Sequence, residues 1–356
     1  MVPPLVSIIL GCYNVESLIL RGMESVLRQT HSNLEIWLVD DGSTDDTGTI
    51  CDQIATKDSR VHVIHQANGG LAAARNAGLS VCQGDYVYFC DVDDELEPNV
   101  IATMVDLASK HDTDMIIFSM DVHDKAAGTV DHTRFKDKLI SSNDELKRGF
   151  CDDIFFSKHG NGFVWNKFYT ASFLKRINAR FGTERIQQDE AFNLRLYPHV
   201  TRLLLTSYKG YNYYLDPHTS TGARFVERKW EAVTSVYHAL TQFQQEWLGC
   251  ASHFNEYIQK RYVNSLTNVF FYNFSSRICP WPSKRIIDKL NEILHTPEVQ
   301  DIILSPAMKQ LRTKDAILWH LLKKKKFCLL FLAEKAFYYL SRLKYRIRSK
   351  TITQHK

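Results

Sequence analysis

The sequence is poor in the features that mark disulfide-rich, zinc-binding and membrane-spanning proteins. Its eight cysteines are scattered along 356 residues, with no CxxC pair and no spacing typical of a zinc site, so we expect reduced thiols in a cytosolic protein. No basic segment precedes the first apolar run, and no apolar run reaches eighteen residues. We therefore expect neither a secretory signal nor a membrane-spanning helix.

Glycine-rich loops are also scarce where a dinucleotide-binding protein would need one. The segment after the first apolar run, "LGCYNVE", offers only Gly11, whereas such a protein carries GxGxxG at this place. No internal repeat or low-complexity tract is evident. The first absence argues against a dinucleotide-dependent oxidoreductase.

What is present is the composition of a globular protein with an uneven distribution of charge. Apolar, charged and aromatic residues make up 44%, 24% and 12% of the chain, so disorder is not expected. The net charge is +4, but residues 312–356 contain thirteen Lys and Arg against two Asp and Glu, which leaves the first 311 residues at −7. This contrast predicts a basic tail with a role distinct from that of the body.

Short apolar runs alternate with amphipathic stretches over the first 120 residues. The runs are near-continuous rather than alternating in polarity, as expected for strands that helices cover on both faces. The expected strands are 5–11, 34–40, 61–65, 86–91 and 114–119, and the expected helices lie near 16–29, 45–57, 70–82 and 98–110. This order predicts an α/β fold with a doubly wound, mostly parallel sheet that binds its ligands at the carboxyl ends of the strands.

The later part of the chain divides into two regions. Residues 121–220 contain aromatic-rich pieces such as "FVWNKFY". We expect them to form the second half of a domain of residues 1–220, whose first half is residues 1–120. Residues 221–356 are helical by periodicity and form a C-terminal helical extension, with the basic tail starting at about 312.

Acidic side chains crowd the ends of two expected strands. Asp40 and Asp41 end the second strand before Gly42, and the fourth strand ends in Asp91, Asp93, Asp94 and Glu95. Like charges this close repel unless a cation neutralises them, and a divalent metal is the usual one. The carboxylate of Asp40 could accept a hydrogen bond from a pyrimidine ring N–H, although a plain strand–turn–helix junction explains this first pair equally well.

A further segment, "NGGLAAARNAGL" (68–79), joins two glycines to a helix of small residues. Its glycines allow a close turn, and Arg75 follows one turn into the helix. A helix N-terminus with an arginine suits a diphosphate, but a salt-bridged surface arginine remains an alternative.

Four segments in this order, "VSIILGCYN", "VDDGSTDDT", "NGGLAAARNAGL" and "GDYVYFCDVDDELEP", resemble the family-two inverting glycosyltransferases of the bacterial polysaccharide type. The resemblance covers roughly residues 5–215 and implies the nucleotide-diphospho-sugar transferase (GT-A-like) fold. It implies that Mn²⁺ or Mg²⁺ is held against the donor diphosphate by Asp93, with Asp94 as its substitute and Asp91 near the ribose. The other nucleotide-binding positions that it implies are Tyr13, Asn14, Asp40, Asp41 and Arg75.

The resemblance also implies an acceptor side. In "QQDEAFNLRLY" it assigns the general base to Asp189, with Glu190 as the alternative, although acidic residues also favour a helix N-terminus on their own. Trp165 and Lys167 would line the acceptor or sugar pocket, with core packing equally open for Trp165. His218, in a possible lid, could reach a phosphate.

The implied function is metal-dependent transfer of a hexose, with inversion, from a nucleotide-diphosphate donor, a UDP-sugar by preference. The acceptor would be a glycan or lipid-linked glycan in the synthesis of a cell-surface polysaccharide such as a capsule. Two alternatives stay open: a non-catalytic glycan- or nucleotide-binding protein on the same fold, and a sugar-phosphate nucleotidylyltransferase.

The basic tail predicts a membrane surface rather than nucleic acid, for which no binding motif accompanies the charge. Four lysines, 323–326, precede an amphipathic helix with one apolar face. That face consists of Leu329, Leu332, Ala336, Leu340, Leu343 and Ile347. We expect residues 321–350 to make a peripheral contact at the inner face of the cell membrane, with packing of this helix on the body as the alternative.

Overall fold

The computed structural model describes residues 2–157, 162–183, 187–215, 225–249, 252–275 and 279–337. The chain divides into two compact units. The first comprises Met1–Ser220 with Gln245–Leu248, and the second comprises Thr221–Gln244 with Gly249–Lys356. His218 and residues 338–356 lie outside the described residues.

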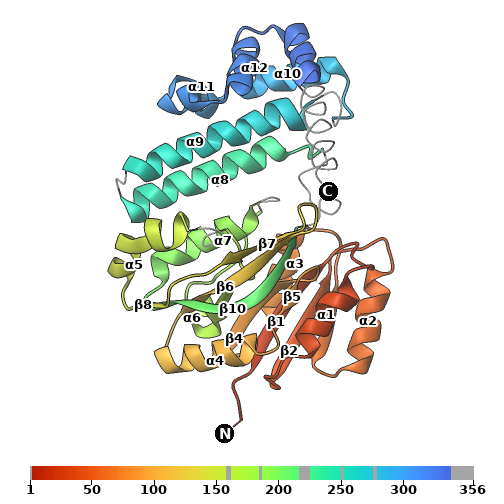
Figure 1. Ribbon diagram of the computed structural model, residues 1–356. Coiled ribbons are helices and arrows are strands. Elements are labelled where there is room, and N and C mark those ends of the chain that lie inside the picture. The colour runs from red at the N-terminus through yellow and green to blue at the C-terminus, as the bar shows by residue number, and fades with distance from the viewer. Residues whose placement is uncertain are drawn as a thin grey trace, which may run out of the picture. The chain divides into compact units, whose positions relative to one another are not determined.

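A single ten-stranded sheet runs through the first unit (Figure 1). Its order is β3-β2-β1-β4-β9-β6-β10-β5, and β7 pairs with β6 while β8 pairs with β10. The strands are β1 (Val6–Cys12), β2 (Leu34–Asp40), β3 (Val61–His65), β4 (Tyr86–Asp91), β5 (Glu95–Leu96), β6 (Met115–Asp124), β7 (Thr129–Thr133), β8 (Lys138–Ile140), β9 (Lys167–Thr170) and β10 (Leu203–Leu215).

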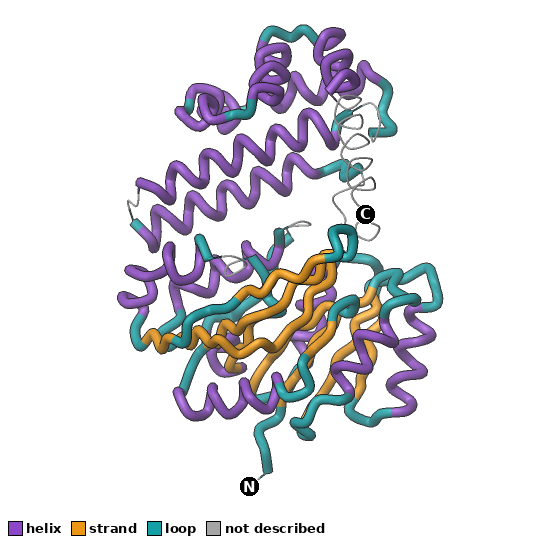
Figure 2. Tube along the Cα trace, in the orientation of Figure 1, coloured by secondary structure: helices purple, strands orange, loops and turns teal. Residues whose placement is uncertain are grey.

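The first four strands are parallel, which confirms the predicted α/β fold with a mostly parallel sheet. Helices cover both faces of this sheet (Figure 2), so the β1 residues Ile8, Ile9 and Leu10 are fully buried. The register pairs Cys12 with Asp40 and Asp40 with His65, and it pairs Gly11 with Asp91. The carboxyl ends of β1 to β4 therefore bring the acidic residues to one edge of the sheet.

The second half of the sheet contains antiparallel strands that the apolar pattern does not reveal. Strand β9 lies between β4 and β6 and is antiparallel to both. Strand β6 continues to Asp124, beyond the expected end at residue 119, because β7 returns along it as an antiparallel partner. Strand β10 runs parallel to β6 with register shifts between Thr206 and Tyr211, and its end pairs with β5.

Among the helices of the first unit, α5 starts with a reciprocal side-chain cap. At α5, Ser142 accepts a hydrogen bond from the Glu145 N–H while the Glu145 carboxylate accepts one from the Ser141 N–H. The helices are α1 (Ile19–Leu27), α2 (Thr47–Lys57), α3 (Leu71–Val81), α4 (Val100–His111), α5 (Asn143–Phe150), α6 (Ala171–Arg176) and α7 (Gln188–Leu196), with a π-helical turn at Cys151–Phe155 and a 3-10 turn at Tyr197–His199.

The described part of the second unit is helical, as predicted. Its helices are α8 (Lys229–Phe243), α9 (Ser252–Asn268), α10 (Ser283–Leu294), α11 (Pro297–Leu304) and α12 (Thr313–Lys323), with a π-helical turn at Val269–Asn273 and a 3-10 turn at Pro306–Gln310. A further π-helical turn, Gln244–Leu248, follows α8 and belongs almost wholly to the first unit. Trp319 is buried in its core and donates its indole N–H to Thr267 Oγ1 at 2.7 Å. Among the described residues, no helix combines the length and the apolar character that crossing a bilayer requires.

Candidate active site

Asp40 ends β2 with its carboxylate held at both oxygens. Oδ1 accepts the Ser43 N–H at 3.0 Å, and Oδ2 lies 2.9 Å from His65 Nδ1. Burial alone would raise the pKa of Asp40, but the hydrogen bonds from Ser43 and His65 prevail and lower it. The carboxylate is therefore ionised at neutral pH, with lone pairs left for a ligand.

Asp41, the next residue, supports the glycine loop instead. Its oxygens accept the N–H groups of Gly69 at 2.9 Å and Gly70 at 2.7 Å and the side-chain amide of Gln66 at 2.6 Å. Gly70 has φ +88°, a conformation that other L-residues rarely adopt. Asp41 is buried, so it shapes the loop before α3 without offering a free oxygen to solvent.

Two residues after β1 complete this edge. Asn14 has φ +51°, and its Oδ1 accepts the Thr44 N–H at 2.8 Å, which ties the first loop to the second. Tyr13 is 48% exposed, so its ring faces solvent beside these loops. Both side chains are exposed, and Tyr13 offers an aromatic face to a ligand.

Arg75 is buried between two carboxylates that come from distant parts of the chain. Its Nη2 donates to Asp91 Oδ1 at 2.7 Å, and its Nη1 donates to Asp189 Oδ1 at 2.5 Å. Phe181 lies beneath the guanidinium, with 5.4 Å between Cζ and the ring centroid. Burial raises the pKa of Asp91 to about 6 against the opposing charge of Arg75, and the charges of Asp189 and Asp93 add to the increase.

The structure separates Asp93 from Asp94. Asp94 is buried, and it accepts the Tyr211 O–H and the Tyr214 N–H, both at 2.9 Å. Burial, together with the charges of Asp93 and Asp91, raises the pKa of Asp94 well above its usual value. Asp93 is half-buried, and its main-chain carbonyl accepts a hydrogen bond from Arg21. In the part of the chain that the structure describes, its carboxylate accepts a hydrogen bond from its own main-chain N–H and from no other residue.

The carboxylate of Asp93, which no other described residue engages, fits a divalent cation that takes most of its ligands from substrate and water. Among the described residues, no group of three His, Cys, Asp or Glu side chains could hold a metal on its own. Mg²⁺ is commonly bound by one or two carboxylates together with substrate phosphates. The oxygens available for this are those of Asp93, since Asp94 is occupied by its two tyrosines.

The start of α7 places Asp189 and Glu190 differently. Asp189 is 15% exposed at its side chain, and its second oxygen accepts the Val164 N–H at 3.3 Å. Glu190 is buried on the inner side of the helix. Of this pair, Asp189 is the residue that contacts Arg75. Part of its carboxylate remains accessible to solvent.

Trp165 and Lys167 both lie inside the fold. Trp165 stacks on Tyr211 with ring centroids 4.3 Å apart, and its carbonyl accepts the Tyr88 O–H at 2.6 Å. Lys167 Nζ donates to the Phe163 carbonyl at 2.5 Å, and burial lowers the pKa of Lys167 to about 7. Neither side chain has surface that an acceptor could contact. Both therefore support the segment 163–167 from the interior of the fold and do not line an acceptor pocket.

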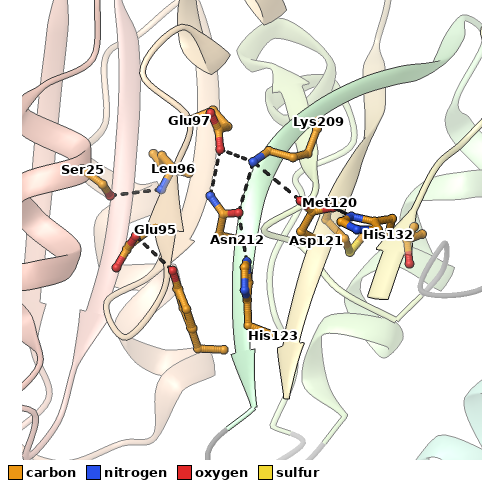
Figure 3. A network of polar contacts seen from close by, with 12 residues as sticks. Ser25, Glu95, Leu96, Glu97, Met120, Asp121, His123, His132, Lys209 and Asn212 are labelled. Carbon is orange, nitrogen blue, oxygen red and sulfur yellow. Dashed lines mark hydrogen bonds and ion pairs between the residues drawn. The ribbon is translucent and has the colours of Figure 1, made fainter. Parts of the chain in front are cut away.

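A polar network ties β5, β6 and β10 together (Figure 3), and its first members follow the acidic turn, residues 91–94, in the sequence. Asn212 donates to Glu97 at 2.9 Å, and Lys209 contacts both Glu97 and Asn212. Lys209 also lies 3.7 Å from Asp121, which is 2.8 Å from His132. The network anchors the chain directly after Asp91, Asp93 and Asp94, and so it helps to fix their backbone.

Several site residues were missed by the sequence analysis. Tyr211 and Tyr214 hold Asp94, and Phe181 supports Arg75, but an aromatic residue in a strand or loop gives no signal of such a role. The role of His65, by contrast, could have been predicted from its position in the sequence. His65 is the last residue of its expected strand, so counting the parallel register would have placed it beside Asp40.

Comparisons with known proteins identify the family and support the fold. The family model "Glycosyl transferase family 2" matches residues 7–175. Two relatives from Bacillus subtilis are the glycosyltransferase EpsJ, 28% identical over 84% of this chain and 86% of its own length, and the glycosyltransferase EpsH, 30% identical over 68% and 70%. TarS of S. aureus has a similar fold, with TM-score 0.59 at 18% identity over 94% of this chain and 91% of that one. The chain therefore belongs to glycosyl transferase family 2 and is a glycosyltransferase.

Proposed function

We propose that the protein is a metal-dependent, inverting glycosyltransferase that uses a UDP-sugar. Its acceptor is a hydroxyl group of a glycan or lipid-linked glycan in the synthesis of a bacterial cell-surface polysaccharide. The observation that carries the proposal is the junction at Arg75. One buried guanidinium joins Asp189 to the acidic turn that holds the accessible carboxylate of Asp93.

On the donor side, the ionised Asp40 accepts the ring N–H of the base, and the exposed ring of Tyr13 covers the nucleotide. Asp91 has one oxygen engaged by Arg75 and the other available to the ribose. Asp93 would hold the divalent cation, which would supply stabilisation of the negative charge on the departing diphosphate.

On the acceptor side, Asp189 is the general base. The acceptor oxygen forms a bond to the anomeric carbon while the bond from that carbon to the diphosphate oxygen breaks, which inverts the configuration. The hydroxyl proton passes to Asp189, and the nucleoside diphosphate leaves. Glu190 is buried, so we assign the base to Asp189 rather than to its neighbour.

Two substitutions test this division of roles in calorimetric UDP binding with Mn²⁺ and in transfer from radiolabelled UDP-sugars. Asp93→Asn should weaken Mn²⁺-dependent UDP binding by roughly tenfold or more, because a charged ligand is lost. Asp189→Asn should leave UDP binding within about twofold but lower kcat by on the order of 100-fold or more. TarS has been crystallised with UDP and with UDP-GlcNAc, so these are the first probes.

Asp106→Asn provides the matched control, because Asp106 is an exposed aspartate on α4. Wild-type turnover in the Asp189 variant would remove that residue from the mechanism. Binding of UDP by the wild-type chain with no transfer to any acceptor would favour a non-catalytic binding protein on this fold.

We also propose a cytoplasmic enzyme with a peripheral contact to the inner face of the cell membrane. Residues 327–337 are helical, and this helix points apolar side chains outward: Leu329 is 54% and Leu332 62% exposed, whereas Leu330 is fully buried. Exposed lysines at 323–326 flank that face. An apolar stripe beside four cations suits an anionic lipid surface. Ala336 of the expected face is also exposed, whereas Leu340, Leu343 and Ile347 lie outside the described residues.

A further inference from the structure

His65 lies between two carboxylates at the edge of the nucleotide half of the sheet. Its Nδ1 is 2.9 Å from Asp40 Oδ2, and its Nε2 is 3.1 Å from Asp52 Oδ1. The histidine ends β3, the edge strand, and Asp52 belongs to α2, which packs against that strand. The ring is 49% exposed, so it is not a buried core group.

This geometry requires a doubly protonated ring. An ionised carboxylate only accepts hydrogen bonds, so each ring nitrogen must donate to satisfy both aspartates. A neutral imidazole has one N–H and can satisfy only one of them. In keeping with this, the hydrogen bond to Asp40, followed by that to Asp52, raises the pKa of His65.

The ring fixes one of the two oxygens of Asp40. The Ser43 N–H fixes the other, and Gly48 lies directly against the side chain, since a Cβ atom there would come within 2.9 Å of Oδ2. The carboxylate is thus held from three sides. Its orientation is set before any ligand arrives, which reduces the ordering that binding would otherwise require.

We propose that His65 is a positioning residue that, with Asp52 behind it, holds Asp40 ionised and oriented to read the imide N–H of a uracil base. The proposal rests on the proposed function, in which Asp40 contacts the donor base. An oriented carboxylate favours uracil over cytosine, because N3 of uracil carries a hydrogen while N3 of cytosine is an acceptor. His65 therefore contributes to donor selection without touching the donor.

The arrangement makes donor affinity depend on pH. The titratable groups that face the ring are Asp40 from β2 and Asp52 from α2. Because the pKa of His65 is raised, the imidazolium with both contacts persists below that value, and the ring loses one N–H as pH rises through it. UDP affinity should be highest on the acid side of this transition and fall on its alkaline side.

Isosteric variants separate orientation from charge. The side-chain nitrogen of Asn can occupy the position of Nδ1, and that of Gln the position of Nε2, so His65→Asn keeps the donor to Asp40 while His65→Gln keeps only the donor to Asp52. We expect UDP affinity at pH 6.5 to stay within about threefold in His65→Asn and to fall roughly tenfold in His65→Gln and His65→Ala. Asp52→Asn should keep the affinity at low pH and move the alkaline loss to lower pH.

The experiment is calorimetric titration of the full chain with UDP and with CDP, in Mn²⁺, between pH 6 and 9, alongside thermal unfolding and kcat at saturating donor. His65→Ala should lower the ratio of UDP to CDP affinity and leave kcat within about twofold, as expected for a role in base binding alone. The control is His62→Ala, an exposed histidine on the same strand.

The outcomes distinguish the two proposals. If the wild-type chain binds UDP and Asp40→Ala weakens binding, but His65→Ala shows wild-type affinity with an unchanged pH profile, the role of His65 is overturned and the proposed function stands. Equal weakening in His65→Asn and His65→Ala would also overturn it. If the wild-type chain binds no UDP, the proposed function fails, and the role of His65 fails with it.

Discussion

At the scale of single residues, the site depends on the shape of one guanidinium. Arg75 donates from two different nitrogens to Asp91 and Asp189, and a planar fork is the group that can bond two carboxylates in fixed directions. Arg75 is fully buried and both carboxylates are mostly buried, so the loss of one donor leaves a carboxylate without its cation. Arg75 thus couples the position of the base to that of the acidic turn.

Arg75→Lys should therefore lower kcat by on the order of 100-fold, because one ammonium group cannot hold both carboxylates and a misplaced base is costly. Steady-state kinetics with saturating donor measure the effect, and calorimetric UDP binding shows whether the variant is folded. The control is Arg28→Lys, whose pair with Glu24 is exposed. A variant with wild-type kcat would show that the junction at Arg75 is dispensable.

The sequence allowed the acidic residues to be predicted, but not their partners. Asp40 and Asp93 follow apolar runs, and a strand end in a parallel sheet has a known location. Arg75 and Asp189 are 114 positions apart in the sequence, and no local pattern predicts that they form a contact. Burial of Lys167 and of Trp165 could not be read from the sequence either, because a segment rich in aromatic residues suits a pocket as well as a core.

At the scale of elements, the parallel strands were predictable and the short antiparallel ones were not. Strands β1 and β4 are near-continuous apolar runs, which burial on both faces explains. Strand β9 has four residues, one of them Lys167, and its place between β4 and β6 is set by tertiary pairing. Strand β5 has two residues and exists because β10 passes beside it.

The network on β5, β6 and β10 shows how such short elements are held. Burial alone would raise the pKa of Glu97 and of Asp121. The hydrogen bond from Lys209 to Glu97 and those from His132 and Arg134 to Asp121 prevail, so both pKa values are lowered. Their contribution to stability is therefore present above the unfolded-state pKa of about 4 and is lost as pH falls through the lower folded values.

Lys209→Met should destabilise the fold by about 1 kcal/mol at pH 7, because Glu97 and Asp121 lose a shared cation in a site that is partly open to water. The difference from wild type should begin to shrink below about pH 4, where the unfolded-state carboxylates take up protons, and should vanish at the lower pH at which the folded carboxylates are protonated. Urea unfolding at pH 7 and pH 3.5 measures this. Lys147→Met, an exposed lysine on α5, is the control. A difference that does not change with pH would assign the loss to packing instead.

At the scale of the whole molecule, the distribution of charge was predictable from the sequence, whereas the outward face of the last described helix was not. An amphipathic pattern identifies an apolar face but does not say whether that face meets protein or solvent. The structure buries Leu330 and leaves Leu329 and Leu332 exposed, so the face that meets solvent is the predicted apolar one. This arrangement supports a lipid surface as the partner of the tail.

Sedimentation with vesicles tests that partner directly. The full chain should bind vesicles that contain about 30% of the anionic lipid phosphatidylserine and should not bind vesicles of pure phosphatidylcholine. The reason is that each lysine near an anionic surface contributes about 1 kcal/mol. Leu329→Asn with Leu332→Asn should weaken binding at least roughly tenfold through lost apolar insertion. Leu304→Asn is the control, since Leu304 is 85% exposed at the end of α11 and outside the proposed surface. Equal binding by the double variant and wild type would show that the apolar face does not enter the bilayer, and absence of wild-type binding would refute the membrane contact altogether.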